Sequence, residues 1–245
     1  MDFIIRVANR YLLIHSVYSR VYELCKPYLA EGNVIPDIEI RITDDLINEE
    51  AERIISTSVK VTDIRNTEWM LLHRMISEAL LAYDTMLMHG AVIAVDNKAY
   101  MFTAKSGTGK TTHIQSWLTN NDSAYVVNGD KPYIIVPETD EFPMACGTPW
   151  AGKEKMQTNT IVPLKAIVLM ERADENHIER VGLAQILPEM LQQVYQPEDR
   201  DKMRQTLNLI QRLSKNVSFW RFHFNNFKDD CFAVSYNALV NGKKE

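Results

Sequence analysis

The stretch from residue 104 to residue 112, Ala-Lys-Ser-Gly-Thr-Gly-Lys-Thr-Thr, constrains the fold of this chain more than any other part of the sequence. Its spacing is that of a phosphate-binding loop, with Ala104 in place of the leading glycine. Residues 99–103 before it predict a β-strand, and residues 111–118 after it predict a helix. A strand, a tight glycine loop and a helix N-terminus together form a nest of backbone N–H groups that attracts anions. The sequence therefore predicts an α/β fold with a phosphate site at this loop.

The motif assigns a role to each part of the loop. Gly107 and Gly109 let the backbone close around an oxyanion without a side-chain clash. Lys110 would reach the terminal phosphates of a nucleotide, and the Thr111 hydroxyl would hold Mg²⁺. The predicted nucleotide-binding residues are Ser106, Gly107, Thr108, Gly109, Lys110, Thr111 and Thr112. The alternative is an ordinary glycine turn followed by an unrelated Lys-Thr pair, which the matching spacing and flanking elements disfavour.

Composition narrows the class of protein. The chain has 245 residues, of which 46% are hydrophobic, enough for one large core or two small ones. The net charge of −5 argues against a general nucleic-acid-binding surface. Its three cysteines are far apart, which argues against a zinc site or a disulfide framework and favours a reducing cytoplasm. No apolar run approaches membrane-spanning length and the start lacks a signal pattern, so we expect a cytoplasmic protein without a membrane partner.

Patterning along the chain predicts two units. Residues 1–85 predict a small α/β unit with an initial hairpin and an amphipathic helix near residues 67–83. Residues 86–245 predict the nucleotide-binding unit, whose last third is mostly helical. Its expected strands are at 91–95, 100–103, 124–127, 133–136, 164–170 and 217–224, and its later helices at 183–195, 197–213 and 227–240.

Three residues outside the loop are candidates for chemistry. Asp130 follows an apolar strand and Gly129, about twenty residues beyond the loop, where a second anchor for Mg²⁺ is expected. The alternative is an ordinary turn aspartate, because Asn-Gly-Asp favours turns. His89 precedes the strand pair that leads into the loop, although a lone histidine is more often structural. Lys153 follows a run of glycine, proline and Trp150 that could close over a nucleotide, or could equally be a surface loop whose tryptophan packs onto the core.

The order of these features is similar to that of a known family. His89-Gly90, a strand pair, the loop at residues 104–112 and a strand ending at Asp130 resemble the catalytic domain of HPr kinase/phosphorylase and its relatives. These are bacterial kinases of serine or threonine hydroxyls, and their nucleotide site is related to that of phosphoenolpyruvate carboxykinase. The loop looks even closer to the carboxykinase version. The resemblance covers about residues 86–172, and the chain looks most like stand-alone relatives found beside peptide-modification genes.

The resemblance implies a mixed-sheet core, a bound nucleotide (ATP or another) and Mg²⁺. It implies that Lys110 and the loop amides bind phosphates, that Thr111 and Asp130 hold the metal, and that His89 lies near the catalytic carboxylate. Asp130 corresponds to the second residue of the family's Asp-Asp pair, and Gly129 stands where the first would be. Asp130 would then have to serve both the metal and the acceptor, or Asn128 or His89 would have to assist.

We therefore predict an ATP- and Mg²⁺-dependent phosphotransferase acting on a hydroxyl of a peptide, a protein or a small molecule. Its expected catalytic residues are Asp130, His89, Lys110 and Lys153. Two alternatives stay open: a non-catalytic nucleotide-binding regulatory module, which the missing carboxylate motivates, and a carboxykinase-like enzyme, for which the chain is short. HPr kinases are oligomers, so the resemblance also implies a homo-oligomer.

Overall fold

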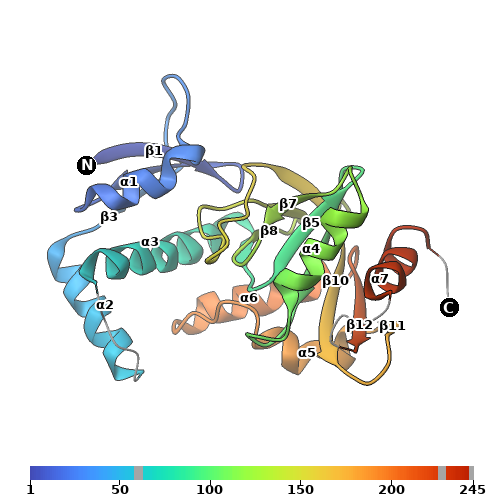
Figure 1. Ribbon diagram of the computed structural model, residues 1–245. Coiled ribbons are helices and arrows are strands. Elements are labelled where there is room, and N and C mark those ends of the chain that lie inside the picture. The colour runs from blue at the N-terminus through green and yellow to red at the C-terminus, as the bar shows by residue number, and fades with distance from the viewer. Residues whose placement is uncertain (58–62, 226–229, 243–245) are drawn as a thin grey trace. The chain divides into compact units, whose positions relative to one another are not determined.

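The computed structural model describes residues 1–57, 63–225 and 230–242. The chain divides into two compact units, Met1–Tyr83 and Asp84–Glu245. Figure 1 shows the helices and strands of each. Among the helices of the described residues, none combines the length and the apolar content needed to cross a membrane.

The first unit contains a three-stranded sheet in the order β1-β2-β3. The predicted hairpin is present: strands β1 (Asp2–Val7) and β2 (Arg10–His15) pair antiparallel, and β3 (Ile38–Arg41) joins β2 in parallel. Its helices are α1 (Ser19–Cys25), α2 (Asp44–Ser56) and α3 (Ile64–Leu80). Two short 3₁₀ turns, η1 (Lys26–Tyr28) and η2 (Leu81–Tyr83), follow α1 and α3. Helix α3 is the amphipathic helix that the sequence predicts, and Leu71, Leu72 and Ile76 are buried along it.

The second unit is built on a mixed nine-stranded sheet, which confirms the predicted mixed α/β class (Figure 1). Along the main path the strand order is β4-β8-β9-β10-β6-β5-β7, and β12 pairs with β10 while β11 pairs with β12. The strands are β4 (Thr85–Leu87), β5 (Ala91–Val95), β6 (Lys98–Thr103), β7 (Tyr125–Asn128), β8 (Tyr133–Ile135), β9 (Met144–Cys146), β10 (Ile161–Arg172), β11 (His177–Val181) and β12 (Ser218–Phe224).

Strand direction brings distant segments to one edge of this sheet. Strands β6, β10 and β12 run parallel, while β5 runs antiparallel to both β6 and β7. The carboxyl ends of β6, β7 and β10 therefore meet the amino end of β5 at the same edge. The β5–β6 hairpin closes the opposite edge through Asp96 and Asn97, whose φ angles are 48° and 57°. Two consecutive residues of positive φ are typical of the tight turn that matches strand twist.

Helices cover this sheet and complete its core. They are α4 (Lys110–Asn120), α5 (Leu183–Leu191), α6 (Arg200–Leu213) and α7 (Cys231–Leu239). Trp117 of α4, Phe102 of β6 and Phe222 of β12 are fully buried in one apolar cluster that also includes residues of α7.

The C-terminal third is less helical than the patterning predicts. The expected helices near 183–195 and 197–213 appear as α5 and α6, and the expected strand at 217–224 appears as β12. Strand β11 precedes α5 in the chain and pairs with β12, although most of its side chains are exposed and give no apolar alternation. The expected helix at 227–240 corresponds to α7 where it is described, and its positions 227–229 lie outside the described residues.

Candidate functional site

The glycine loop joins the carboxyl end of β6 to the first turn of α4. Gly107 has a φ of 77° and Gly109, at the N-cap of α4, a φ of 125°, which are conformations that other residues rarely adopt. No side chain caps the N-terminus of α4, so its first N–H groups are not used by the protein's own side chains. This is the backbone arrangement that favours a bound anion at a helix N-terminus.

Lys110 folds back over the loop. Its Nζ donates a hydrogen bond to the carbonyl oxygen of Ala104 at 3.1 Å, across the mouth of the loop. Burial lowers the pKa of Lys110, while the nearby Asp130 acts in the opposite direction. The amine therefore lies at the glycine loop, where it lines a cavity.

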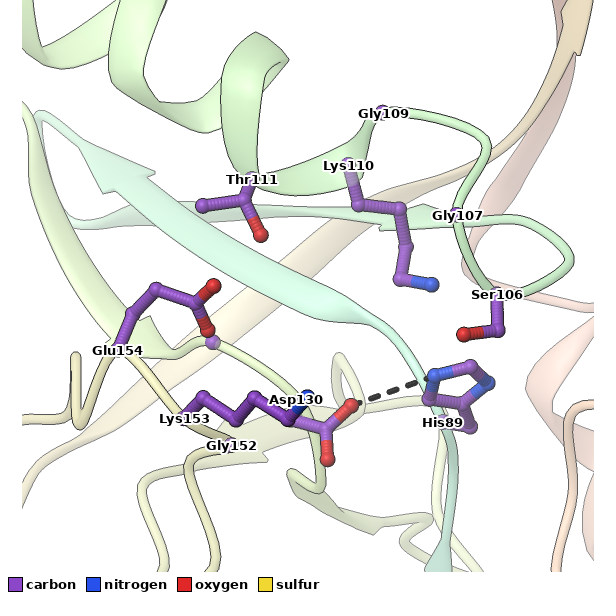
Figure 2. Close-up of a pocket in the computed structure, with 11 residues that line it drawn as sticks. His89, Ser106, Gly107, Gly109, Lys110, Thr111, Asp130, Gly152, Lys153 and Glu154 are labelled. Atoms are coloured by element: carbon purple, nitrogen blue, oxygen red, sulfur yellow. Dashed lines mark ion pairs between the residues drawn. The ribbon is translucent and has the colours of Figure 1, made fainter.

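A cavity of about 460 Å³ opens beside this loop. Figure 2 shows the residues that line it. The cavity brings together most of the residues that the sequence singles out, from four separate segments of the chain. Its lining consists of His89, Ser106, Gly107, Gly109, Lys110, Thr111, Gly129, Asp130, Gly152, Lys153 and Glu154. Two predicted nucleotide-binding residues lie elsewhere: the Thr108 hydroxyl donates to the Lys105 carbonyl at 2.7 Å, and Thr112 is exposed outside this lining.

Asp130 and His89 form an ion pair in this cavity, drawn as a dashed line in Figure 2. The His89 Nε2 atom lies 3.2 Å from the Asp130 Oδ1 atom. Burial alone would raise the pKa of Asp130, but the hydrogen bond from His89 and the charges of Lys131 and Lys110 outweigh it and lower this pKa. Asp130 is therefore held as a carboxylate that accepts hydrogen bonds.

The turn that presents Asp130 is built by Asn128. The Asn128 Oδ1 atom accepts hydrogen bonds from the backbone N–H groups of Asp130 and Lys131, at 2.9 and 2.7 Å. Its Nδ2 atom donates to the Thr148 carbonyl and hydroxyl oxygens, at 3.1 and 3.0 Å. Asn128 is fully buried by these contacts, so it shapes the site without lining the cavity.

The structure also explains the glycine at position 129. A Cβ atom there would lie 3.2 Å from the carbonyl oxygen of Ala151 and 3.3 Å from that of Met156. The Gly129 N–H donates to the same Met156 oxygen at 2.9 Å. The segment that follows Trp150 therefore occupies the space that an aspartate side chain would need.

That segment supplies a carboxylate of its own to the cavity. Trp150 is only 7% exposed, so it packs onto the core as the structural alternative expects, while Lys153 and Glu154 face the cavity. Gly152 has a φ of 76°, and a Cβ atom there would lie 3.1 Å from the Asp130 Cβ atom. This close approach places Glu154, which the sequence analysis did not select, in the same cavity as Asp130 and Thr111 (Figure 2).

These oxygen donors fit a magnesium ion that is shared with a substrate. Mg²⁺ is usually held by one or two carboxylates together with substrate phosphates. Thr111, Asp130 and Glu154 provide a hydroxyl and two carboxylates in the cavity beside the glycine loop. Among the described residues, no group of three or more His, Cys, Asp or Glu side chains is arranged so that it could hold a metal ion.

His89 is anchored by a residue that lies 104 positions away. Its backbone N–H donates to the Gln193 carbonyl oxygen at 2.6 Å, and its Nδ1 atom lies 2.8 Å from the Gln193 Oε1 atom. Its own carbonyl oxygen accepts from the Thr103 hydroxyl at 2.7 Å, which ties it to the end of β6. No signal in the sequence connects Gln193 with His89, because the contact depends on the fold.

A second cavity, of about 390 Å³, lies at the carboxyl ends of β6 and β10. Its lining comes from the loop, the end of β10 and the end of α5: Lys105, Thr108, Leu169, Met170, Glu171, Arg172, Glu189, Gln192 and Gln193. Arg172 donates to the carbonyl oxygens of Gly107 and Thr108, at 3.1 and 3.3 Å, and so fixes the loop from outside. Gln193, which touches His89, and Lys105, which precedes Ser106, place this cavity next to the first one.

No protein-family model matches the chain, and no curated protein matches it either. Among solved structures, it is similar to the HPr(Ser) kinase/phosphatase from Coxiella burnetii, with 8% sequence identity and a TM-score of 0.36. The match covers 64% of this chain and 88% of that one. A similarity of this size carries no argument about the reaction, so the proposals below depend on the geometry of the site.

Proposed function

We propose that this protein is a phosphotransferase with an HPr kinase-like core, which transfers the terminal phosphoryl group of ATP to a hydroxyl with the help of Mg²⁺. The observation that carries the proposal is the shared cavity, in which Lys110 and the open N-terminus of α4 face the His89–Asp130 pair. Catalysis of phosphoryl transfer depends mainly on positioning and charge neutralisation, and these are the two properties that such a cavity supplies.

Each residue would act on a different part of the reaction. The loop amides and Lys110 bind the β- and γ-phosphates, and Lys153 neutralises charge on the transferred group. Thr111, Asp130 and Glu154 would hold Mg²⁺, which withdraws charge from the phosphate oxygens. Asp130 accepts the proton of the attacking hydroxyl, and His89 orients the carboxylate through its Nε2 atom.

The second cavity offers a place for the acceptor. None of its lining residues is aromatic, so it lacks the stacking surface that an adenine ring commonly uses. Charged side chains of both signs and two amides line it instead, which suits a polar molecule: Lys105, Arg172, Glu171, Glu189, Gln192 and Gln193. We therefore propose that the acceptor enters there and presents its hydroxyl to Asp130 past the His89–Gln193 pair.

The test is transfer of labelled γ-phosphate from ATP in the presence of Mg²⁺, first to water and then to pooled peptides, proteins and small polar metabolites. Asp130→Asn should lower the rate about 10²- to 10⁴-fold and leave nucleotide affinity within about threefold. Asp122→Asn, at an exposed position near α4, is the matched control and should keep the wild-type rate.

Two results would contradict the proposal. A Lys110→Met variant that transfers phosphate as fast as the wild type would exclude the loop as the phosphoryl site. A wild-type protein that binds ATP tightly but transfers to no acceptor, including water, would favour the non-catalytic regulatory module.

A further inference from the structure

The two carboxylates that line the second cavity are both paired within the protein. Arg221 of β12 bridges them: its Nη1 atom donates to Glu171 of β10, and its Nη2 atom lies 3.3 Å from the Glu189 Oε1 atom of α5. The same Nη2 atom donates to the Gln185 carbonyl oxygen at 3.1 Å, and the His223 Nδ1 atom lies 3.9 Å from the other oxygen of Glu171. Arg221 is outside the cavity lining and its side chain is only 18% exposed. It therefore neutralises both carboxylates without occupying the cavity.

The two cations that line this cavity have no such partner. Lys105 lies just beyond the end of β6 and Arg172 is the last residue of β10, and the parallel pairing of these strands brings both to one edge. Arg172 uses its Nε and Nη2 atoms for loop carbonyls, which are dipoles without a net charge. Across the described part of the chain, neither Lys105 nor Arg172 has a carboxylate partner, and Lys105 is exposed. This side of the cavity therefore carries positive charge that the protein does not compensate.

These cations belong to the second cavity and not to the first. Lys105 and Arg172 line the second cavity, whereas the lining of the first includes neither of them and takes its loop cation from Lys110. A nucleotide whose phosphates fill the first cavity therefore leaves the charge of Lys105 and Arg172 to another group. Gln192 adds an amide NH₂ to the same lining. Cationic and amide N–H groups are the donors with which proteins bind carboxylates and phosphates.

We infer that the acceptor carries an anionic group, a carboxylate or a phosphate, which Lys105 and the Nη1 atom of Arg172 bind in the second cavity while its hydroxyl reaches Asp130. This inference rests on the proposed function, because it names the substrate class of that reaction. The balance of charge decides the sign: with Arg221 included, three cations surround two carboxylates. A cationic acceptor would add to this excess of positive charge, whereas an anionic one compensates it.

The experiment compares matched pairs of hydroxyl compounds that differ in one anionic group. The pairs are glycerate and glyceramide, the dipeptide Gly-Ser with a free and with an amidated carboxyl terminus, and glycerol 3-phosphate and glycerol. The full chain is first saturated with Mg²⁺ and the non-transferring analogue AMP-PNP, so that the glycine loop is filled. Binding is measured by titration with ligand-observed saturation-transfer NMR. In at least one pair, the anionic member should bind about tenfold more tightly than its neutral partner, and the pair that shows this distinguishes a carboxylate from a phosphate.

Variants then locate the bound anion. Lys105→Gln keeps a long polar side chain and removes the charge, so it should weaken binding of the preferred anion about tenfold and leave its neutral partner unchanged. Lys98→Gln, at the exposed start of β6, is the matched control and should keep the wild-type affinities. Gln192→Trp, which fills the second cavity, should abolish binding of the anion.

Equal affinities or no binding in every pair would overturn the inference, and so would a preference for the anion that survives in Lys105→Gln. An anion that is lost in Lys110→Met but kept in Lys105→Gln would occupy the glycine loop, which would overturn it as well. The binding readout does not require phosphoryl transfer. A protein that binds the anion through Lys105 but transfers phosphate to no acceptor would contradict the proposed function and leave the anion site intact. Transfer to the neutral members as fast as to the anionic ones would leave the proposed function standing and refute the acceptor class.

Discussion

His113 lies on α4, one turn behind the glycine loop, and its environment predicts how the protein responds to acid. The ring is fully buried, with its centroid 4.7 Å from that of Phe102. The Trp117 indole N–H donates to its Nε2 atom at 3.2 Å, so that nitrogen is unprotonated and the ring is neutral. Burial lowers the pKa of His113 from 6.5 to about 3.

This shift couples folding to pH with a definite sign. Below about pH 6.5 the unfolded chain takes up a proton at this position, whereas the folded chain does not until about pH 3. The free energy of unfolding therefore falls as pH decreases through this window. One pKa unit corresponds to about 1.4 kcal/mol, so the loss due to His113 between pH 7 and pH 5 is about 2 kcal/mol.

His113→Leu should remove this loss, because leucine fills a similar volume and does not titrate. The Trp117 N–H keeps a partner in the variant, since the Ser235 hydroxyl also lies 3.1 Å from it. Urea unfolding followed by circular dichroism at pH 7 and pH 5 would measure the difference between wild type and variant. His177→Leu, an exposed position on β11, is the control and should keep the wild-type dependence. Equal losses in the wild type and in His113→Leu would refute the burial argument.

Three further predictions concern the site. Arg172→Met should loosen the loop and weaken nucleotide binding about fivefold, since exposed charged hydrogen bonds contribute about 1 kcal/mol. Titration with a fluorescent nucleotide measures this affinity, and Arg180→Met, at an exposed position, is the control. Equal affinities in Arg172→Met and the wild type would contradict the prediction. Gln192→Trp should fill the second cavity and lower the rate of transfer to a polar acceptor at least about tenfold, while the affinity for ATP stays unchanged. A loss of ATP affinity as large as the loss of transfer rate would show that the nucleotide binds in this cavity. Gly152→Ala should displace Asp130 and reduce kcat about tenfold or more, while nucleotide affinity stays within about twofold of the wild type. An unchanged kcat in steady-state assays would contradict the reasoning from the close contact between Gly152 and Asp130.

The parts of the fold that could be predicted are those encoded by neighbouring residues. The strand, loop and helix around Gly107 and Gly109 follow one another directly, so the spacing of the motif describes their geometry. Helix α3 was recognisable because its buried residues recur at helical intervals. Strands β4 and β9 have three residues each and show no periodicity, so their pairing could not be inferred from the sequence.

The site shows the same difference between local and distant information. Asp130 was recognisable because it follows directly after a strand. Gln193 was not, because it reaches His89 across 104 residues. Glu154 was overlooked because its approach to the cavity depends on the close contact of Gly152 with Asp130, which is a property of packing. Thr108 belongs to the motif by spacing, but the backbone of this loop turns its side chain back onto the Lys105 carbonyl.

The hairpin turn at Asp96 and Asn97 has a practical consequence for the use of this protein. Strand β5 spans five residues, so the turn lies about 17 Å along the strand from the edge that holds the cavity. A peptide tag or a small reporter domain inserted between these two residues would extend away from the loop, His89 and Asp130. The protein could therefore be labelled or immobilised at this turn while the cavity at the glycine loop stays open to its ligands.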